Sequence, residues 1–237
     1  MSARYVESCA AEDHPFIATR RPGHPRLLHS LSTLFTVFCL SISISAWAEG
    51  DKDGPFEFDH RLHYDNSGIW ARKYQLAVEY GLVAGAVGFA LYEGSESRAG
   101  SVAWKTLDSM LITAGVVQVA KPVFSRARPS QSDDSGKFFQ GKGHRSFPSG
   151  EVAHVAAAVT PMLMEYGQEK PWLYAAAGTL LVYDSVARMK ARGHWLSDVI
   201  GATAIGAGTG YLMEKRDKSL IVSALPGGVF VGYSKRW

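Results

Sequence analysis

Cysteine is almost absent from this chain of 237 residues, which holds only Cys9 and Cys39. Both precede residue 49, so a chain that begins at Glu49 has no disulfide, no thiolate metal site and no cysteine nucleophile. The excess of one charge sign is also small, because 25 lysines and arginines are nearly balanced by 22 aspartates and glutamates. The sequence contains no basic tract, and a nucleic-acid partner is therefore not expected.

The apolar content, in contrast, is that of a folded chain with a core. Apolar residues make up 46% of the sequence and charged residues 20%, a composition that excludes a disordered chain. The longer apolar stretches have helical lengths and are rich in glycine and alanine, so we predict an all-α fold, a bundle of five to six helices. Five helices are expected near residues 74–92, 104–120, 150–166, 172–188 and 196–213.

Three segments surround or precede the predicted helical domain, which we place at residues 74–219. Residues 1–48 are predicted to be an export signal. Residues 49–73 are polar and rich in turn residues, and they predict an irregular arm. Residues 220–237 alternate weakly between apolar and polar residues, and they predict a tail with a short strand or hairpin.

The N-terminal segment has the pattern of a secretory signal peptide. Arg20, Arg21 and Arg26 precede an uncharged run over residues 27–48 that ends in Ala-Trp-Ala, and small residues at this spacing are typical of a cleavage site after Ala48. The alternative is an uncleaved anchor, because about 20 apolar residues can span a bilayer. In both cases we expect the rest of the chain to be exported, either as a periplasmic protein or facing the periplasm from the inner membrane.

Whether the bundle is soluble or membrane-embedded is left open by the sequence. Four polar or charged residues, Glu79, Asp108, His154 and Asp184, lie inside the apolar segments, where a membrane makes charge costly. The mean hydropathy is −0.05. These features favour a soluble exported bundle. Counting the N-terminal run as a helix gives six helices whose basic loops face one side, and this favours the membrane-embedded form.

His194 and Asp198 are candidates for catalysis. They lie four residues apart at the start of a predicted helix, so they share one face. A carboxylate beside an imidazole can hold the proton of one ring nitrogen and leave the other nitrogen free to attack. Gly193 allows the backbone to turn sharply just before the pair. Taken alone, the pair is equally compatible with an ion pair on the surface.

Two other segments offer groups that bind anions. Ser149 precedes an apolar helical run and suits an N-cap, and the free N–H groups of the helix start at Gly150 form a ready anion site. Lys121 and Arg128 lie on either side of a proline-marked break. Arginine binds phosphate through two parallel hydrogen bonds, and lysine acts as a compact charge. By themselves, these segments also fit an ordinary capped helix and a basic surface loop.

Together, the segments K-x6-RP, PSG and R-x5-H-x3-D resemble the type 2 phosphatidic acid phosphatase superfamily, which includes bacterial acid phosphatases, lipid phosphate phosphatases and vanadium haloperoxidases. The resemblance implies that His194 attacks phosphorus and forms a phosphohistidine, and that Asp198 orients His194. It also implies a phosphate-binding set made of Lys121, Arg128, Ser149, Gly150 and Arg188. Phosphoryl transfer depends mainly on positioning and charge stabilisation. The family needs no metal or cofactor, and vanadate is expected to bind as a phosphate mimic.

The sequence departs from the family pattern at Glu151, where the family has the histidine that protonates the leaving group. Three options are open. Glu151 is itself the acid if burial raises its pKa, or His154 or His144 supplies the proton, or the acid is missing and only good leaving groups react. A smaller departure is Ala187, which stands where the family usually has serine and should weaken anion binding.

The predicted function is metal-independent hydrolysis, outside the cytoplasm, of phosphomonoesters or lipid (pyro)phosphates. The partner is then a phosphorylated small molecule or a lipid phosphate, with membrane association as an option. The departure at Glu151 motivates an alternative, a phosphate-binding or membrane-associated protein of the same fold with impaired catalysis. A vanadate-dependent haloperoxidase is less favoured, because those chains are usually much longer and rely on the histidine that Glu151 replaces.

Overall fold

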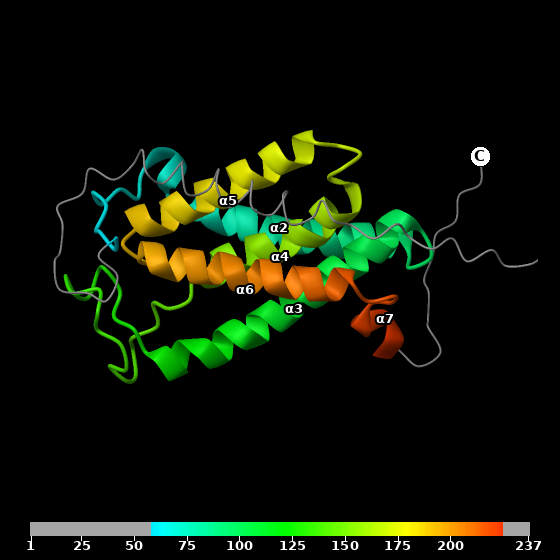
Figure 1. Ribbon diagram of the computed structural model, residues 1–237. Coiled ribbons are helices and arrows are strands. Elements are labelled where there is room, and N and C mark those ends of the chain that lie inside the picture. Colours follow the sequence, from blue (N-terminus) through cyan, green and yellow to red (C-terminus); the bar gives the residue numbers. More distant parts are fainter. Residues whose placement is uncertain (1–57, 225–237) are drawn as a thin grey trace, which may run out of the picture.

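Six α-helices and one short 3-10 helix make up the described part of the chain. The computed structural model describes residues 58–224, and no strand lies within this range. In chain order the elements are η1 (Gly68–Trp70), α2 (Arg72–Glu93), α3 (Arg98–Phe124), α4 (Gly150–Tyr166), α5 (Trp172–Lys190), α6 (Leu196–Glu214) and α7 (Leu220–Ala224). The all-α prediction is confirmed, and Figure 1 shows the five long helices side by side in a bundle.

The five long helices correspond to the five that the sequence predicts, and α3 differs most. It is ten residues longer than expected, because it starts at Arg98 and continues through Pro122 to Phe124. Its start is capped by Ser97, whose side-chain oxygen accepts a hydrogen bond from the Gly100 N–H at 2.9 Å. Its end is marked by Ser125, which takes a left-handed conformation with φ 37°.

The tail forms a helix where the structure describes it, in place of the expected strand or hairpin. The N–H groups of Leu220 and Ile221, in the first turn of α7, donate to the carboxylate of Asp108 at 2.5 and 3.0 Å. A carboxylate at a helix N-terminus satisfies free donors and complements the helix dipole. Asp108 belongs to α3, so a contact distant in sequence decides the local structure. Residues 225–237 and the predicted signal peptide lie outside the described residues.

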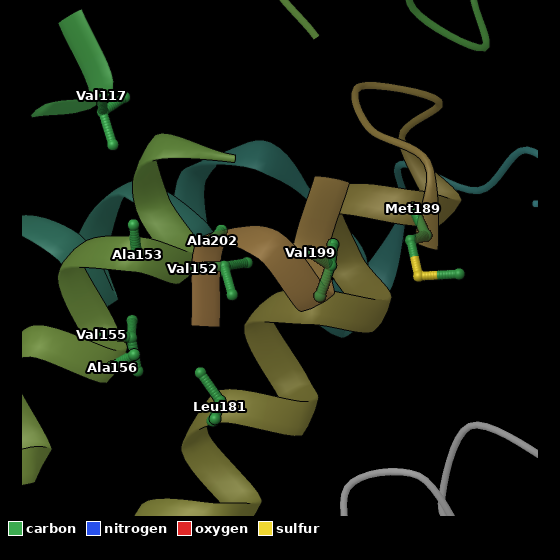
Figure 2. Packing of buried hydrophobic residues seen from close by; sticks show 9 residues of the cluster. All are labelled: Val117, Val152, Ala153, Val155, Ala156, Leu181, Met189, Val199 and Ala202. Carbon is green, nitrogen blue, oxygen red and sulfur yellow. The ribbon is translucent and has the colours of Figure 1, made fainter. Parts of the chain in front are cut away.

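Helix α4 is the centre of the bundle and packs against α2, α3, α5 and α6. Figure 2 shows the largest core cluster, in which Val152 and Val155 of α4 lie near Leu181 of α5 and Val199 of α6. The closest approach is between α4 and α6. A Cβ atom on Gly206 would lie 2.1 Å from the backbone oxygen of Ala153, so only glycine allows this spacing.

Helices α2 and α3 carry much of the exposed apolar surface. Both are long and apolar enough to cross a membrane, and few of their residues are buried inside the bundle. The two helices are joined by a short turn and pack against each other. In Figure 1 this turn lies at one end of the bundle, and η1, the loop between α3 and α4 and the turn between α5 and α6 lie at the other end.

Candidate active site

His194 lies in the turn between α5 and α6, and its side chain is only 4% exposed. Its Nδ1 atom lies 2.7 Å from the backbone oxygen of Ser146. A carbonyl oxygen can only accept a hydrogen bond, so Nδ1 carries the proton and Nε2 keeps its lone pair. Burial, opposed by Asp198 and reinforced by Arg188, lowers the pKa of His194 to about 4. At neutral pH the residue is therefore a neutral imidazole whose Nε2 can act as a nucleophile.

Asp198, in the first turn of α6, is completely buried and holds the turn that carries His194. Its Oδ2 atom accepts hydrogen bonds from the Trp195 N–H at 2.9 Å and from the Ser146 hydroxyl at 2.5 Å. The same oxygen lies 3.8 Å from His194 Nδ1, beyond hydrogen-bond range. Asp198 thus holds the two neighbours of the imidazole. Trp195 directly follows His194 in the chain, and the carbonyl of Ser146 accepts the hydrogen bond from His194 Nδ1.

Arg126 contacts the candidate site through Asp198, and the sequence analysis missed it. Its guanidinium is 0% exposed and donates to Asp198 Oδ1 at 2.6 Å and to Asp59 Oδ2 at 2.6 Å. It also donates twice to the backbone oxygen of Ser135, at 2.9 and 2.6 Å. Asp59 in turn accepts from the N–H and hydroxyl of Ser197. One arginine therefore ties together the arm, the loop after α3 and the start of α6.

The sequence held a weak signal for Arg126 and none for Asp59. Arg126 stands two residues before Arg128 in the K-x6-RP segment, where a second arginine could have been singled out. Asp59 belongs to the arm that was predicted to be irregular. Nothing in its neighbourhood indicates that it accepts hydrogen bonds from a residue 138 positions away.

The predicted phosphate-binding groups converge on one cavity of about 490 Å³. Its wall holds most of the residues expected at the site: Lys121, Arg128, Gly150, Glu151, His154, Arg188 and His194. Ser149 and Asp198 lie behind this wall and do not line it. The Ser149 hydroxyl is buried and has no hydrogen-bond partner within residues 58–224. It occupies the N-cap position of α4 without making a side-chain cap.

Two basic groups of the cavity, Lys121 and Arg188, are held by neighbouring elements. Lys121 Nζ donates to the backbone oxygens of Arg145 and Pro148 at 3.2 and 2.9 Å, which places it at the start of α4. Arg188 Nη1 donates to the side chain of Gln75 at 2.9 Å. A Cβ atom on Gly193 would lie 2.8 Å from Arg188 Nη2. The glycine therefore leaves the space that the guanidinium of Arg188 occupies.

Glu151 is tied to two arginines. Its carboxylate forms a two-point ion pair with Arg72, with distances of 2.5 and 2.6 Å, and its Oε2 lies 3.5 Å from Arg188 Nε. Burial raises the pKa of Glu151, but the hydrogen bond from Arg72 and the charge of Arg188 outweigh burial and leave the pKa below its usual value. The condition under which Glu151 would be the acid, a raised pKa, is not met in this arrangement.

The two other candidates for the acid differ in position. His154 lines the cavity, and its Nδ1 atom lies 3.1 Å from Oε1 of Glu79, which lines the cavity as well. The Nε2 atom of His154 is buried without a hydrogen-bond partner in the described part of the chain. His144 is not among the cavity residues. Glu79, like Arg72, was not predicted to belong to the site.

Residues 102–217 match the model of the PAP2 superfamily, and this range contains all three segments singled out in the sequence. A lipid A 1-phosphatase from Porphyromonas gingivalis is 30% identical over 121 residues, which are 51% of this chain and 25% of the relative. The chain thus spans about a quarter of that relative's length. A transmembrane PAP2 type phosphatidylglycerolphosphate phosphatase from Bacillus subtilis is 16% identical, with 79% of this chain and 87% of that chain covered at a TM-score of 0.42.

Proposed function

Because residues 102–217 match the model of the PAP2 superfamily, we propose that this chain is a phosphatase that hydrolyses lipid phosphates through a phosphohistidine on His194. The observation that supports this most strongly is the tautomer of His194. The Ser146 carbonyl accepts a hydrogen bond from the protonated Nδ1, and Nε2 keeps its lone pair in a cavity lined by Lys121, Arg128 and Arg188. The similarity to a lipid A 1-phosphatase supports a lipid phosphate as substrate.

The reaction proceeds in two displacements at phosphorus. In the first, Nε2 of His194 forms a bond to phosphorus, the bond from phosphorus to the leaving oxygen breaks, and that oxygen takes up a proton. In the second, water attacks the phosphohistidine, inorganic phosphate leaves, and Nε2 regains its lone pair. Lys121, Arg128 and Arg188 stabilise the charge on the phosphoryl oxygens, together with a hydrogen bond from the Gly150 N–H.

The position of the cavity supports a substrate at a membrane surface. Arg72 is the first residue of α2 and Lys121 lies in the last turn of α3. Because α2 and α3 form an antiparallel pair, both residues lie at the same end of the two helices that can cross a membrane. The phosphate of a lipid lies at the membrane surface, and its chains would extend along the exposed apolar faces of α2 and α3. The predicted signal peptide supports the periplasmic side for this cavity.

The test is the release of inorganic phosphate by the full chain in detergent micelles or vesicles. Wild type is compared with His194→Ala and with His63→Ala, an exposed histidine outside the cavity. The substrates are an aryl phosphate, phosphatidic acid and an isoprenoid pyrophosphate. We expect release that His194→Ala abolishes and His63→Ala preserves. Equal release by the His194→Ala variant would refute the proposed nucleophile, and preference for the aryl phosphate would refute the lipid substrate.

Trapping of the intermediate gives a second readout. A phosphohistidine survives alkali and is lost in acid, whereas a phosphoserine does the opposite. Rapid quenching with labelled phosphate ester should therefore give label that is stable in alkali and absent from His194→Ala. Vanadate binding without turnover of any substrate would instead support the alternative, a phosphate-binding protein with impaired catalysis, which the replacement at Glu151 motivates.

A further inference from the structure

We propose that His154, held by Glu79, is the residue that protonates the leaving group, and that Glu151 serves to position Arg72 and Arg188. This inference rests on the proposed phosphatase function. It assigns roles to three residues on α2 and α4 that face one cavity. It also explains how a chain with glutamate in place of the usual histidine can retain a proton donor.

Glu151 is occupied by its arginine partners. Both carboxylate oxygens are hydrogen-bonded to Arg72, and one of them lies 3.5 Å from Arg188 as well. Release of a proton from Glu151 would require a neutral carboxylic acid between two guanidinium groups, which strongly favour the ionised form. Replacing the family histidine by glutamate therefore brings a carboxylate that fixes the two arginines, one of which is expected to bind phosphate.

His154 has the position and the free nitrogen that a proton donor needs. It follows Glu151 by three residues on α4, so the two side chains lie on adjacent faces of the same helix. His154 lines the cavity together with His194. Its Nε2 atom is buried, and none of residues 58–224 offers it a hydrogen bond. A buried polar atom without a partner at the wall of a cavity is suited to a group of the substrate.

Glu79 fixes the orientation of this imidazole. Its Oε1 atom lies 3.1 Å from His154 Nδ1, which places the Nδ1 proton between the two groups and directs Nε2 away from α2. A carboxylate that accepts from one ring nitrogen leaves the other nitrogen to exchange protons with the substrate. Glu79 is thus a positioning residue.

The proton balance is complete with these groups. In the first displacement the His154 imidazolium gives its Nε2 proton to the leaving oxygen and becomes neutral, while the Nδ1 proton stays with the Glu79 contact. In the second displacement neutral His154 takes a proton from the attacking water, and the product is inorganic phosphate. The imidazolium is restored, and no further reactant is needed.

The test uses aryl phosphates whose leaving groups range from poor to good, with the full chain in detergent. The second-order constant kcat/KM reports formation of the phosphohistidine alone, so it separates the first step from the second. A missing acid slows poor leaving groups more than good ones. We expect His154→Gln to lower kcat/KM about 100-fold for the poorest leaving group and far less for the best one. Glu79→Gln should give the same dependence with a smaller loss.

Glu151→Gln is the matched control on the same helix. It should lower kcat/KM by a similar factor for all leaving groups, because it disturbs Arg72 and Arg188 and not the proton transfer. The assignment would be overturned if His154→Gln lowered kcat/KM equally for all leaving groups or did not lower it at all. It would also be overturned if the loss of kcat/KM in Glu151→Gln grew with poorer leaving groups. If His154→Gln does not fold, the leaving-group dependence of Glu79→Gln decides. His194→Ala should lose all activity, even with the best leaving group, because every substrate needs the nucleophile. Its result therefore tests the nucleophile separately from the acid.

Discussion

Replacing Arg126 by methionine is expected to destabilise the protein strongly, because it leaves two buried carboxylates without their partner. Asp59 and Asp198 are both 0% exposed, and each lies 2.6 Å from the guanidinium of Arg126. Breaking a buried ion pair by removing one partner costs about 3–5 kcal/mol. For a chain of this size, 1 kcal/mol corresponds to about 2–4 °C in Tm, so we expect a fall of about 6–20 °C.

The assay is thermal unfolding in detergent, followed by circular dichroism, with Arg98→Met as the matched control. Arg98 also pairs with two carboxylates, Glu165 and Glu169, but its side chain is 50% exposed. Exposed ion pairs contribute little to stability, so this variant should lose no more than about 4 °C. Equal losses in the two variants would refute the argument that burial decides the effect.

A second substitution isolates the charge imbalance from the loss of packing. Adding Asp59→Asn to Arg126→Met removes one of the two unpaired carboxylates, and part of the lost stability should return. A double variant that is as unstable as the sum of the single variants would show that packing, and not unpaired charge, dominates at this site.

Two further predictions concern His194 and Gly193. Since burial lowers the pKa of His194 to about 4, its imidazole should stay neutral, with the proton on Nδ1, as pH falls from 8 to about 5, and should protonate only near pH 4. Nitrogen-15 NMR of histidine-labelled protein, with His194→Ala for assignment, measures this, and protonation near pH 6.5 would contradict it. Gly193→Ala should weaken vanadate inhibition about tenfold, because the new Cβ would lie 2.8 Å from Arg188 Nη2 and displace a charged hydrogen-bond donor. Gly208→Ala, which meets nothing within 4 Å, is the control, and equal inhibition constants for the two variants would refute the role of Gly193.

The helices could be predicted from the sequence where local signals mark their ends. Helix α4 begins at Gly150, directly after Pro148 and Ser149, and α6 begins after the turn at Gly193. Both starts agree with the sequence prediction to the residue. Helix α3 was predicted too short at both ends, and Pro122, which was interpreted as part of a break, lies inside the helix. Near the C-terminal end of a helix, a proline removes one backbone hydrogen bond without stopping the helix.

The site could be predicted only where its residues belong to short motifs. Lys121, Arg128, Arg188 and His194 were identified from three short motifs and from the family resemblance that these motifs carry, and they line one cavity. The partners that decide their chemistry come from elsewhere in the chain. Arg72 is 79 residues from Glu151, and Glu79 is 75 residues from His154. Such pairs depend on how α2 packs against α4, and no local pattern encodes that contact. The roles assigned to the individual residues remain predictions that the variants above test.

The network around Arg126 has a consequence for where a working unit of this protein begins. The match to the superfamily starts at residue 102, yet Asp59 and Arg72 lie upstream and are bound to Arg126 and Glu151. A fragment cut at the start of the match would keep every recognised motif and lose the counter-charges that hold them. If this domain were fused to another protein, the fused segment would have to include the residues from Asp59 onward as well as the motifs.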